Sequence, residues 1–115
     1  MEIDASLQAA ADYYARFHFL NADPFQLSHW LDGGPGDRAW SRGYCCAVGE
    51  ILATSEGGPE GMIALWMGSA PHSAIIADGS YDHVGVACFQ GPYVDSAGVT
   101  IQPILCGAEF GNSVP

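Results

Sequence analysis

The chain has 115 residues, of which 49% are hydrophobic and 14% are charged, enough for one compact core and too few for two. Three arginines, no lysine and thirteen acidic residues give a formal net charge of −10, so no basic patch exists for a phosphate backbone or an anionic membrane surface. Nucleic-acid binding is excluded. The most apolar stretch, residues 61–76, is interrupted by Gly68, Pro71 and His72, and it is too short for a membrane span of about 20 residues. We expect one soluble domain over residues 1–115.

The N-terminal half predicts a helix followed by a loop. Apolar and aromatic residues recur at helical spacing from Leu7 to His18, after Asp4 as a potential N-cap. Residues 21–24 end this helix of about five turns, because the residue before a proline disfavours helical backbone. Residues 24–43 are rich in turn-forming glycine, proline and aspartate, which predicts an ordered loop with one short helical turn near residues 37–41. A loop of this length usually has a function.

The remaining elements alternate between strands and short helices. Residues 47–53 predict a buried strand, and Pro59 and Ser69 mark the starts of two helices that together reach residue 76. Residues 83–89 and 99–105 predict an antiparallel hairpin, in which Pro103 indicates an edge strand or a bulge. The order of elements indicates an α+β fold in which helices pack on a small antiparallel sheet.

The four cysteines, Cys45, Cys46, Cys88 and Cys106, lack C-x-x-C spacing, which excludes zinc-ribbon and thioredoxin-type sites. A bridge between the adjacent Cys45 and Cys46 would close a strained small ring. We therefore favour bridges from this pair to Cys88 and Cys106, or a single bridge between Cys88 and Cys106. Four buried free thiols are the alternative. Disulfides would indicate an oxidising compartment.

Three polar residues lie in apolar or glycine-rich surroundings: His29, Glu50 and His72. His72 falls in the first turn of a predicted helix after Ser69, where the helix dipole disfavours the protonated imidazole and leaves a ring able to accept a proton or bind a metal. The alternative is structural, with Glu50 accepting backbone hydrogen bonds and each histidine connecting loops. Spacing alone does not bring the three together, and no G-x-S-x-G, H-E-x-x-H, Walker or dinucleotide motif is present.

Over about residues 7–110, an ordered series of short motifs resembles the bacterial branch of the CAP superfamily, also called SCP-like, which groups cysteine-rich secretory, antigen-five and pathogenesis-related proteins. The motifs are Asp32-Gly33-Gly34, Arg38, Arg42-Gly43-Tyr44, Gly49-Glu50-Ile51, residues 66–76 and Val84-Gly85-Val86-Ala87. The resemblance implies an α-β-α sandwich with a cleft that holds two histidines and one or two glutamates, where several relatives bind a divalent metal.

Carried over residue by residue, His29 and His72 resemble the two cleft histidines and Glu50 resembles the first glutamate. Ser69 stands where other members carry the second glutamate, and Ile51 stands where most carry asparagine. Arginine and asparagine after the second histidine are replaced by serine and isoleucine, and the leading segment before the first helix is missing. These departures weaken an inference of shared catalysis more than one of shared fold.

The first functional hypothesis is an extracellular binding module whose cleft, formed by His29, Glu50 and His72, holds zinc or another divalent metal, or a small ligand. Two imidazoles and one carboxylate suit a tetrahedral zinc site with water in the fourth position. The second hypothesis is a metal-assisted hydrolase that uses the same residues, with Glu50 as general base or His72 as acid and base. No nucleophile elbow or oxyanion-hole motif accompanies them.

A third hypothesis is a structural subunit of a homo-oligomer or larger assembly, with a protein partner. Residues 109–115 have little reason to be rigid alone, so either a neighbouring subunit or packing against the sheet would have to order them. The tryptophans Trp30, Trp40 and Trp66 are interpreted as core and loop anchors rather than as a platform for sugars.

Overall fold

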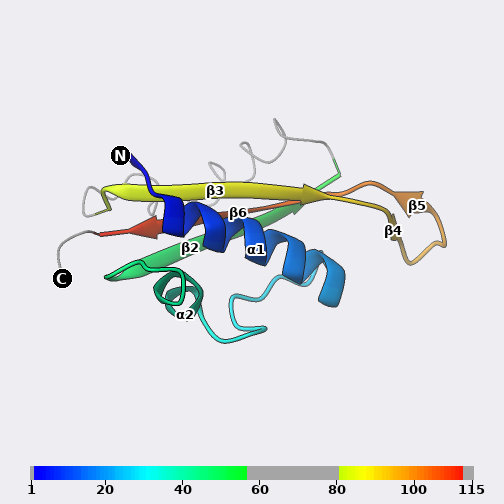
Figure 1. Cartoon of the computed structure of the whole chain (residues 1–115). Coiled ribbons are helices and arrows are strands. Elements are labelled where there is room, and N and C mark those ends of the chain that lie inside the picture. The colour runs from blue at the N-terminus through cyan, green and yellow to red at the C-terminus, as the bar shows by residue number, and fades with distance from the viewer. Residues whose placement is uncertain (1, 57–80, 113–115) are drawn as a thin grey trace.

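The computed structural model describes residues 2–56 and 81–112, which form an α+β fold (Figure 1). The main sheet has the strand order β1-β3-β6-β2. Its strands are β1 (Glu2–Ile3), β2 (Val48–Ser55), β3 (His83–Gln90) and β6 (Ile104–Gly111). Helix α1 (Ala5–Asn21) lies across one face of this sheet, and α2 (Pro35–Trp40) packs beside it against β2. A two-stranded sheet of β4 (Tyr93–Val94) and β5 (Thr100–Ile101) extends from one end.

Helix α1 confirms the first predicted element. The Asp4 side chain accepts a hydrogen bond from the Leu7 N–H at 3.0 Å, as expected of an N-cap. The buried face of the helix packs against β3 and β6. The approach is close, because a Cβ on Gly85 of β3 would overlap the backbone of Leu7 and Gln8. Only glycine therefore fits at this position of β3.

The predicted strand at residues 47–53 is confirmed as β2, and the predicted helical turn is confirmed as α2. The predicted hairpin is also present, since β3 pairs antiparallel with β6. The expected antiparallel sheet is mixed, however, because the short β1 pairs parallel with β3. This strand is only two residues long, too short to give a periodic signal.

The second strand of the hairpin lies further along the chain than predicted. It runs from Ile104 to Gly111 rather than over residues 99–105, and it lies in the centre of the sheet between β3 and β2. Pro103 directly precedes its first residue, so the missing N–H interrupts no pairing inside the strand. All eight residues of β6 are buried. Residues 109–111 are thus held by strands of their own chain.

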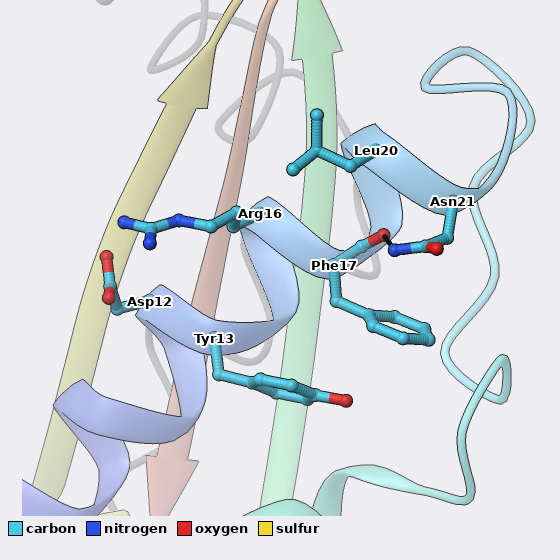
Figure 2. Close-up of a pocket in the computed structure, with 6 residues that line it drawn as sticks. All are labelled: Asp12, Tyr13, Arg16, Phe17, Leu20 and Asn21. Atoms are coloured by element: carbon cyan, nitrogen blue, oxygen red, sulfur yellow. Dashed lines mark hydrogen bonds between the residues drawn. The ribbon is translucent and has the colours of Figure 1, made fainter.

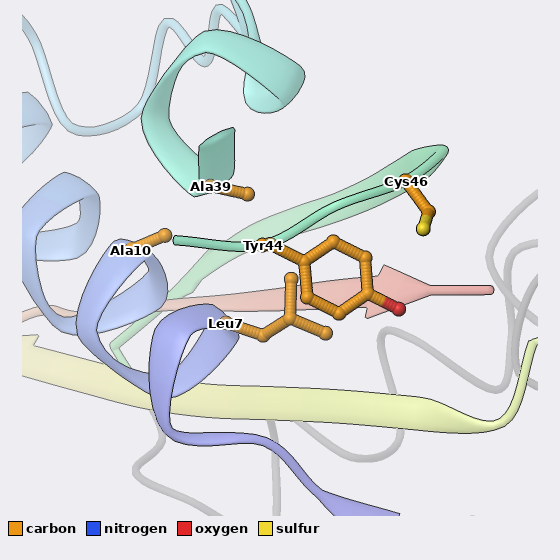
Figure 3. Packing of buried hydrophobic residues seen from close by; sticks show 5 residues of the cluster. All are labelled: Leu7, Ala10, Ala39, Tyr44 and Cys46. Atoms are coloured by element: carbon orange, nitrogen blue, oxygen red, sulfur yellow. The ribbon is translucent and has the colours of Figure 1, made fainter. Parts of the chain in front are cut away.

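The buried residues form clusters on both faces of the sheet. We call the face that α1 covers the helix face. Figure 3 shows one cluster there, in which Leu7 and Ala10 of α1 meet Ala39 of α2 and, from the following loop, Tyr44 and Cys46. A second cluster on this face joins α1 to the sheet and consists of Ala15, Phe19, Leu105 and Phe89. On the opposite face, Ile51 of β2 packs with Ala108 and Phe110 of β6.

The disulfides bear out one favoured prediction and correct another. The Cys88–Cys106 bridge is confirmed, whereas the expectation that Cys45 and Cys46 are not bonded to each other is wrong. Cys88 and Cys106 are direct partners in the β3–β6 register. Cys46 instead packs with the helix-face cluster, so the two pairs are already separated by the fold. Cross-bridges between them would require a different arrangement of the loop before β2.

The two helices predicted within residues 59–76 lie outside the described residues, and so does the second helical layer expected of an α-β-α sandwich. Within residues 2–56 and 81–112, neither helix combines the length and apolarity needed to cross a membrane.

Candidate functional site

Arg38 is the centre of a buried charged cluster on the helix face. The short helix α2 carries this arginine, which is only 2% exposed. One terminal nitrogen donates to Glu50 Oε2 and the other to Asp32 Oδ1, both at 2.7 Å. Both nitrogens also donate to the carbonyl of His29 at 3.2 Å. The guanidinium lies 3.4 Å from the ring centroid of Tyr14, a distance typical of a cation–π contact.

The cluster brings together two of the predicted site residues, His29 and Glu50. His29 Nδ1 lies 2.6 Å from Glu50 Oε1, and an ionised carboxylate only accepts, so Nδ1 carries the proton of this hydrogen bond. The Glu50 side chain is 1% exposed, whereas that of His29 is 42% exposed. Both oxygens of Glu50 are therefore occupied by His29 and Arg38, while the imidazole still reaches the surface.

Glu109 is a further member of the cluster that the sequence analysis missed. It is the direct partner of Glu50 in the β2–β6 register and is 1% exposed. Burial raises the pKa of Glu109 to about 10, helped by a hydrogen bond with Glu50 and by the negative charge of Glu50. Its signal in the sequence was an acid inside an apolar run, which is the same signal that singled out Glu50.

Glu50 titrates in the opposite direction. Burial alone would raise its pKa, but hydrogen bonds from His29 and Glu109, together with the charge and hydrogen bond of Arg38, lower the pKa below its ordinary value. The two facing carboxyl groups therefore differ in charge: Glu50 is ionised and Glu109 is protonated. This arrangement avoids two neighbouring buried negative charges.

Helix α1 holds the loop that carries His29. The Ser28 N–H donates to Nε2 of the buried His18 at 3.0 Å, and the Tyr14 hydroxyl donates to the Ser28 carbonyl at 2.5 Å. The same hydroxyl accepts from the Leu31 N–H at 3.2 Å. Burial lowers the pKa of His18, which keeps its ring neutral and able to accept. The two α1 side chains thus position the loop on both sides of His29.

A groove of about 380 Å³ lies beside the cluster. His29 and Glu50 line it together with the start of α2, Val48 of β2 and two tryptophans. Trp30 is 71% exposed and Trp40 is 52% exposed, so neither is a core residue. The interpretation as a loop anchor is confirmed for Trp40, because its Nε1 donates to the Cys46 carbonyl at 2.7 Å. Trp66 lies outside the described residues.

A second hollow lies on the exposed side of α1 (Figure 2). There the rings of Tyr13 and Phe17 point to one side of the helix, while Asp12 and Arg16 point to the other. This hollow contains no member of the charged cluster. The groove beside His29 is the candidate site, because the half-exposed imidazole of His29 lines it.

His72 and Ser69, the other predicted cleft residues, lie outside the described residues. In the part of the chain that the structure describes, no group of three or more histidine, cysteine, aspartate or glutamate side chains is arranged to hold a metal ion. The sequence analysis assigned no role to Arg38 beyond its place in the motif series, although Arg38 makes most of the contacts that organise the site.

Comparison with known proteins identifies the family. The model of the CAP family, described as the cysteine-rich secretory protein family, matches residues 1–102. Among solved structures, the fold is similar to that of an outer surface protein from Borrelia burgdorferi, with a TM-score of 0.64 and 21% identity over 97% of this chain and 77% of that chain. No curated protein sequence matches. The match over residues 1–102 shows that the chain belongs to the cysteine-rich secretory protein (CAP) family.

Proposed function

We propose that this protein is an extracellular binding module whose groove beside His29 binds a divalent metal ion, with zinc as the first candidate. The observation that supports this most directly is the half-exposed imidazole of His29, fixed from behind by the buried Glu50 carboxylate at 2.6 Å. Histidines that ligate metals usually donate their other ring nitrogen to a carboxylate or carbonyl, which orients the ring. His29 already has this partner.

The donor set defines what each residue would contribute. Nε2 of His29 would be the ligand, since Nδ1 is bonded to Glu50. Glu50 fits the role of orienting carboxylate, because His29 and Arg38 occupy both of its oxygens. His72 is the proposed second ligand, on the resemblance of its motif alone. A zinc ion bound here would supply a Lewis-acidic centre with positions open to water or a small ligand.

An extracellular location is supported by the covalent structure and by the comparisons. The Cys45–Cys46 and Cys88–Cys106 disulfides are of a kind that persists in oxidising compartments. The family is described as secretory, and the similar solved structure is that of an outer surface protein.

Binding is favoured over the two other hypotheses. A hydrolase that uses Glu50 as general base needs a carboxylate that readily takes up a proton from water. His29 and Arg38 occupy both oxygens of Glu50 and lower its pKa despite its burial, which makes this carboxylate a weak base. The assembly hypothesis rests on the need for something to order the C-terminal segment. Residues 109–111 belong to β6 and are ordered by the sheet of their own chain, so they need no partner subunit.

Calorimetric titration with zinc tests the proposal. The wild type should bind zinc, while His29→Ala and His72→Ala should each bind it at least about tenfold more weakly, because each removes a proposed ligand. His83→Ala is the matched control, since His83 bonds to Tyr44 and does not line the groove. Identical isotherms for the four proteins, or no zinc binding by the wild type, would refute a metal site at His29.

A further inference from the structure

We infer that the same groove binds a small quaternary ammonium compound of the choline type against the indoles of Trp30 and Trp40. The inference rests on the proposed function in one respect, that the groove beside His29 is a binding site, but it requires no metal. It adds a second ligand class, recognised by aromatic faces and negative charge.

The first step is that both indoles are held in place while remaining exposed. Trp30 lies against the backbone at Gly34, where an added Cβ would overlap its ring. Trp40 lies against Gly36, where a Cβ would come within 2.6 Å of the ring, and its Nε1 is bonded to the Cys46 carbonyl. Both rings line the same groove, and exposed apolar side chains gathered in one groove often mark a ligand site. These contacts reduce the side-chain freedom that a ligand would otherwise have to remove.

The second step is the charge of the groove. The lining includes the carboxylates of Asp37 and Glu50 and contains no arginine among the described residues. Asp37 has no cationic partner in the described part of the chain, and the whole protein carries a net charge of −10. Arg38 compensates the charge of Glu50, so the carboxylate of Asp37 is the group that favours a cation over an anion in the groove. Tryptophan has the most favourable aromatic face for a cation.

The third step separates a quaternary ammonium from other cations and from sugars. The Gly34 N–H already occupies Asp37 Oδ2 at 2.9 Å, and His29 and Arg38 occupy both oxygens of Glu50. A primary ammonium brings three N–H donors and a sugar ring brings several hydroxyls, and burying such groups unpaired costs free energy. A quaternary ammonium brings charge and methyl surface but no donor. It matches a groove with indole faces, a carboxylate and few unused acceptors.

The test compares choline with its uncharged analogue, in which a tert-butyl group replaces the trimethylammonium group. Binding is measured by calorimetry on the full chain in the presence of a chelator, so that metal plays no part. Choline should bind at least about tenfold more tightly than the analogue, because only the charged group gains from the indoles and from Asp37. Equal binding of the two compounds, or no binding of choline, would overturn the inference.

Three variants locate the choline site. Trp30→Leu and Trp40→Leu should each weaken choline binding by about three- to thirtyfold. Gly36→Ala keeps both tryptophans but displaces the Trp40 ring, so it should weaken binding even where a tryptophan variant fails to fold. Leu20→Ala, an exposed apolar position on α1, is the control and should bind as the wild type does. Unchanged affinity in Gly36→Ala and in both folded tryptophan variants would contradict the assignment.

The two proposals fail separately. Zinc binding without choline binding would refute the ammonium site and leave the metal site intact. Choline binding under chelator, in a protein whose zinc isotherms do not depend on His29, would refute the metal site and leave the ammonium site.

Discussion

Leu105 and Glu109 lie on the same face of β6 and are both buried, but Leu105 has apolar neighbours whereas Glu109 has polar and charged ones. Leu105 lies in an apolar cluster with Ala15 and Phe19 of α1. Glu109, four residues further along the strand, lies beside Glu50 in the cluster organised by Arg38. At Leu105, contact area with apolar neighbours stabilises the fold. At Glu109, stability depends on the carboxyl group keeping its proton and on the neighbouring charges of Glu50 and Arg38.

The difference explains where the site lies. Replacing a buried ion pair by apolar residues is often neutral or stabilising. The stability of the fold therefore does not explain why this end of the sheet carries charged residues. It does hold Glu50 behind His29, at the edge of the groove. The apolar end anchors the C-terminal half of α1, whereas the charged end orients a side chain that reaches solvent.

The largest effect is expected from Arg38→Met. Glu50 and Asp32 would lose their cationic partner, and the free energy of unfolding should fall by about 3–5 kcal/mol, as for other broken buried ion pairs. Urea unfolding measures this change. Arg16→Met is the matched control, because Arg16 is exposed and the same substitution should change stability by less than about 0.5 kcal/mol. Equal effects of the two substitutions would show that the cluster is not organised by Arg38.

At the apolar end, Leu105→Ala should lower the free energy of unfolding by about 3 kcal/mol through lost contacts and a cavity. No titrating group takes part, so the loss should be the same at every pH at which the protein folds. Thermal unfolding at several pH values checks this. A loss that varies with pH would mean that the two ends of the sheet are coupled.

Glu109→Gln should stabilise the protein near neutral pH. The pKa of Glu109 rises from 4.5 to about 10 on folding, so its contribution is complete below pH 4.5 and is lost as the pH rises toward 10. Glutamine remains neutral and can still donate to Glu50. The gain should therefore be about 3 kcal/mol near pH 7 and should vanish near pH 4. Destabilisation at both pH values would show that Glu109 is not protonated in the folded protein.

The smallest effect is expected from Thr54→Val, at the apolar end of β2. The Thr54 hydroxyl donates to the Pro24 carbonyl at 2.5 Å, so this substitution removes a neutral hydrogen bond. We expect a loss of about 1 kcal/mol in the free energy of unfolding. Chemical denaturation, compared with Arg38→Met, checks the ranking. A loss as large as that of Arg38→Met would show that charge is not what distinguishes the two ends.

The sequence predicted what local pattern and motif order can determine. The cap at Asp4 and the apolar spacing of α1 are local signals, and the motif series indicated His29 and Glu50 as neighbours. The pairing of Glu109 with Glu50 depends on strand register, which no local pattern encodes. The position of β6 was missed because Pro103 stands at its boundary rather than inside it, and because glycine and glutamate interrupt its apolar pattern. Trp30 packs against Gly34 and Trp40 against Gly36, contacts that apolar spacing alone does not predict.

The most direct test replaces the charged side chains around His29 together in one quadruple variant, Arg38→Met with Asp32→Asn, Glu50→Leu and Glu109→Leu, and measures its unfolding free energy and its zinc affinity. If the cluster orients His29 rather than stabilising the fold, the variant should be at least as stable as the wild type and should bind zinc about ten- to a hundredfold more weakly. A folded variant that binds zinc with wild-type affinity would contradict the account.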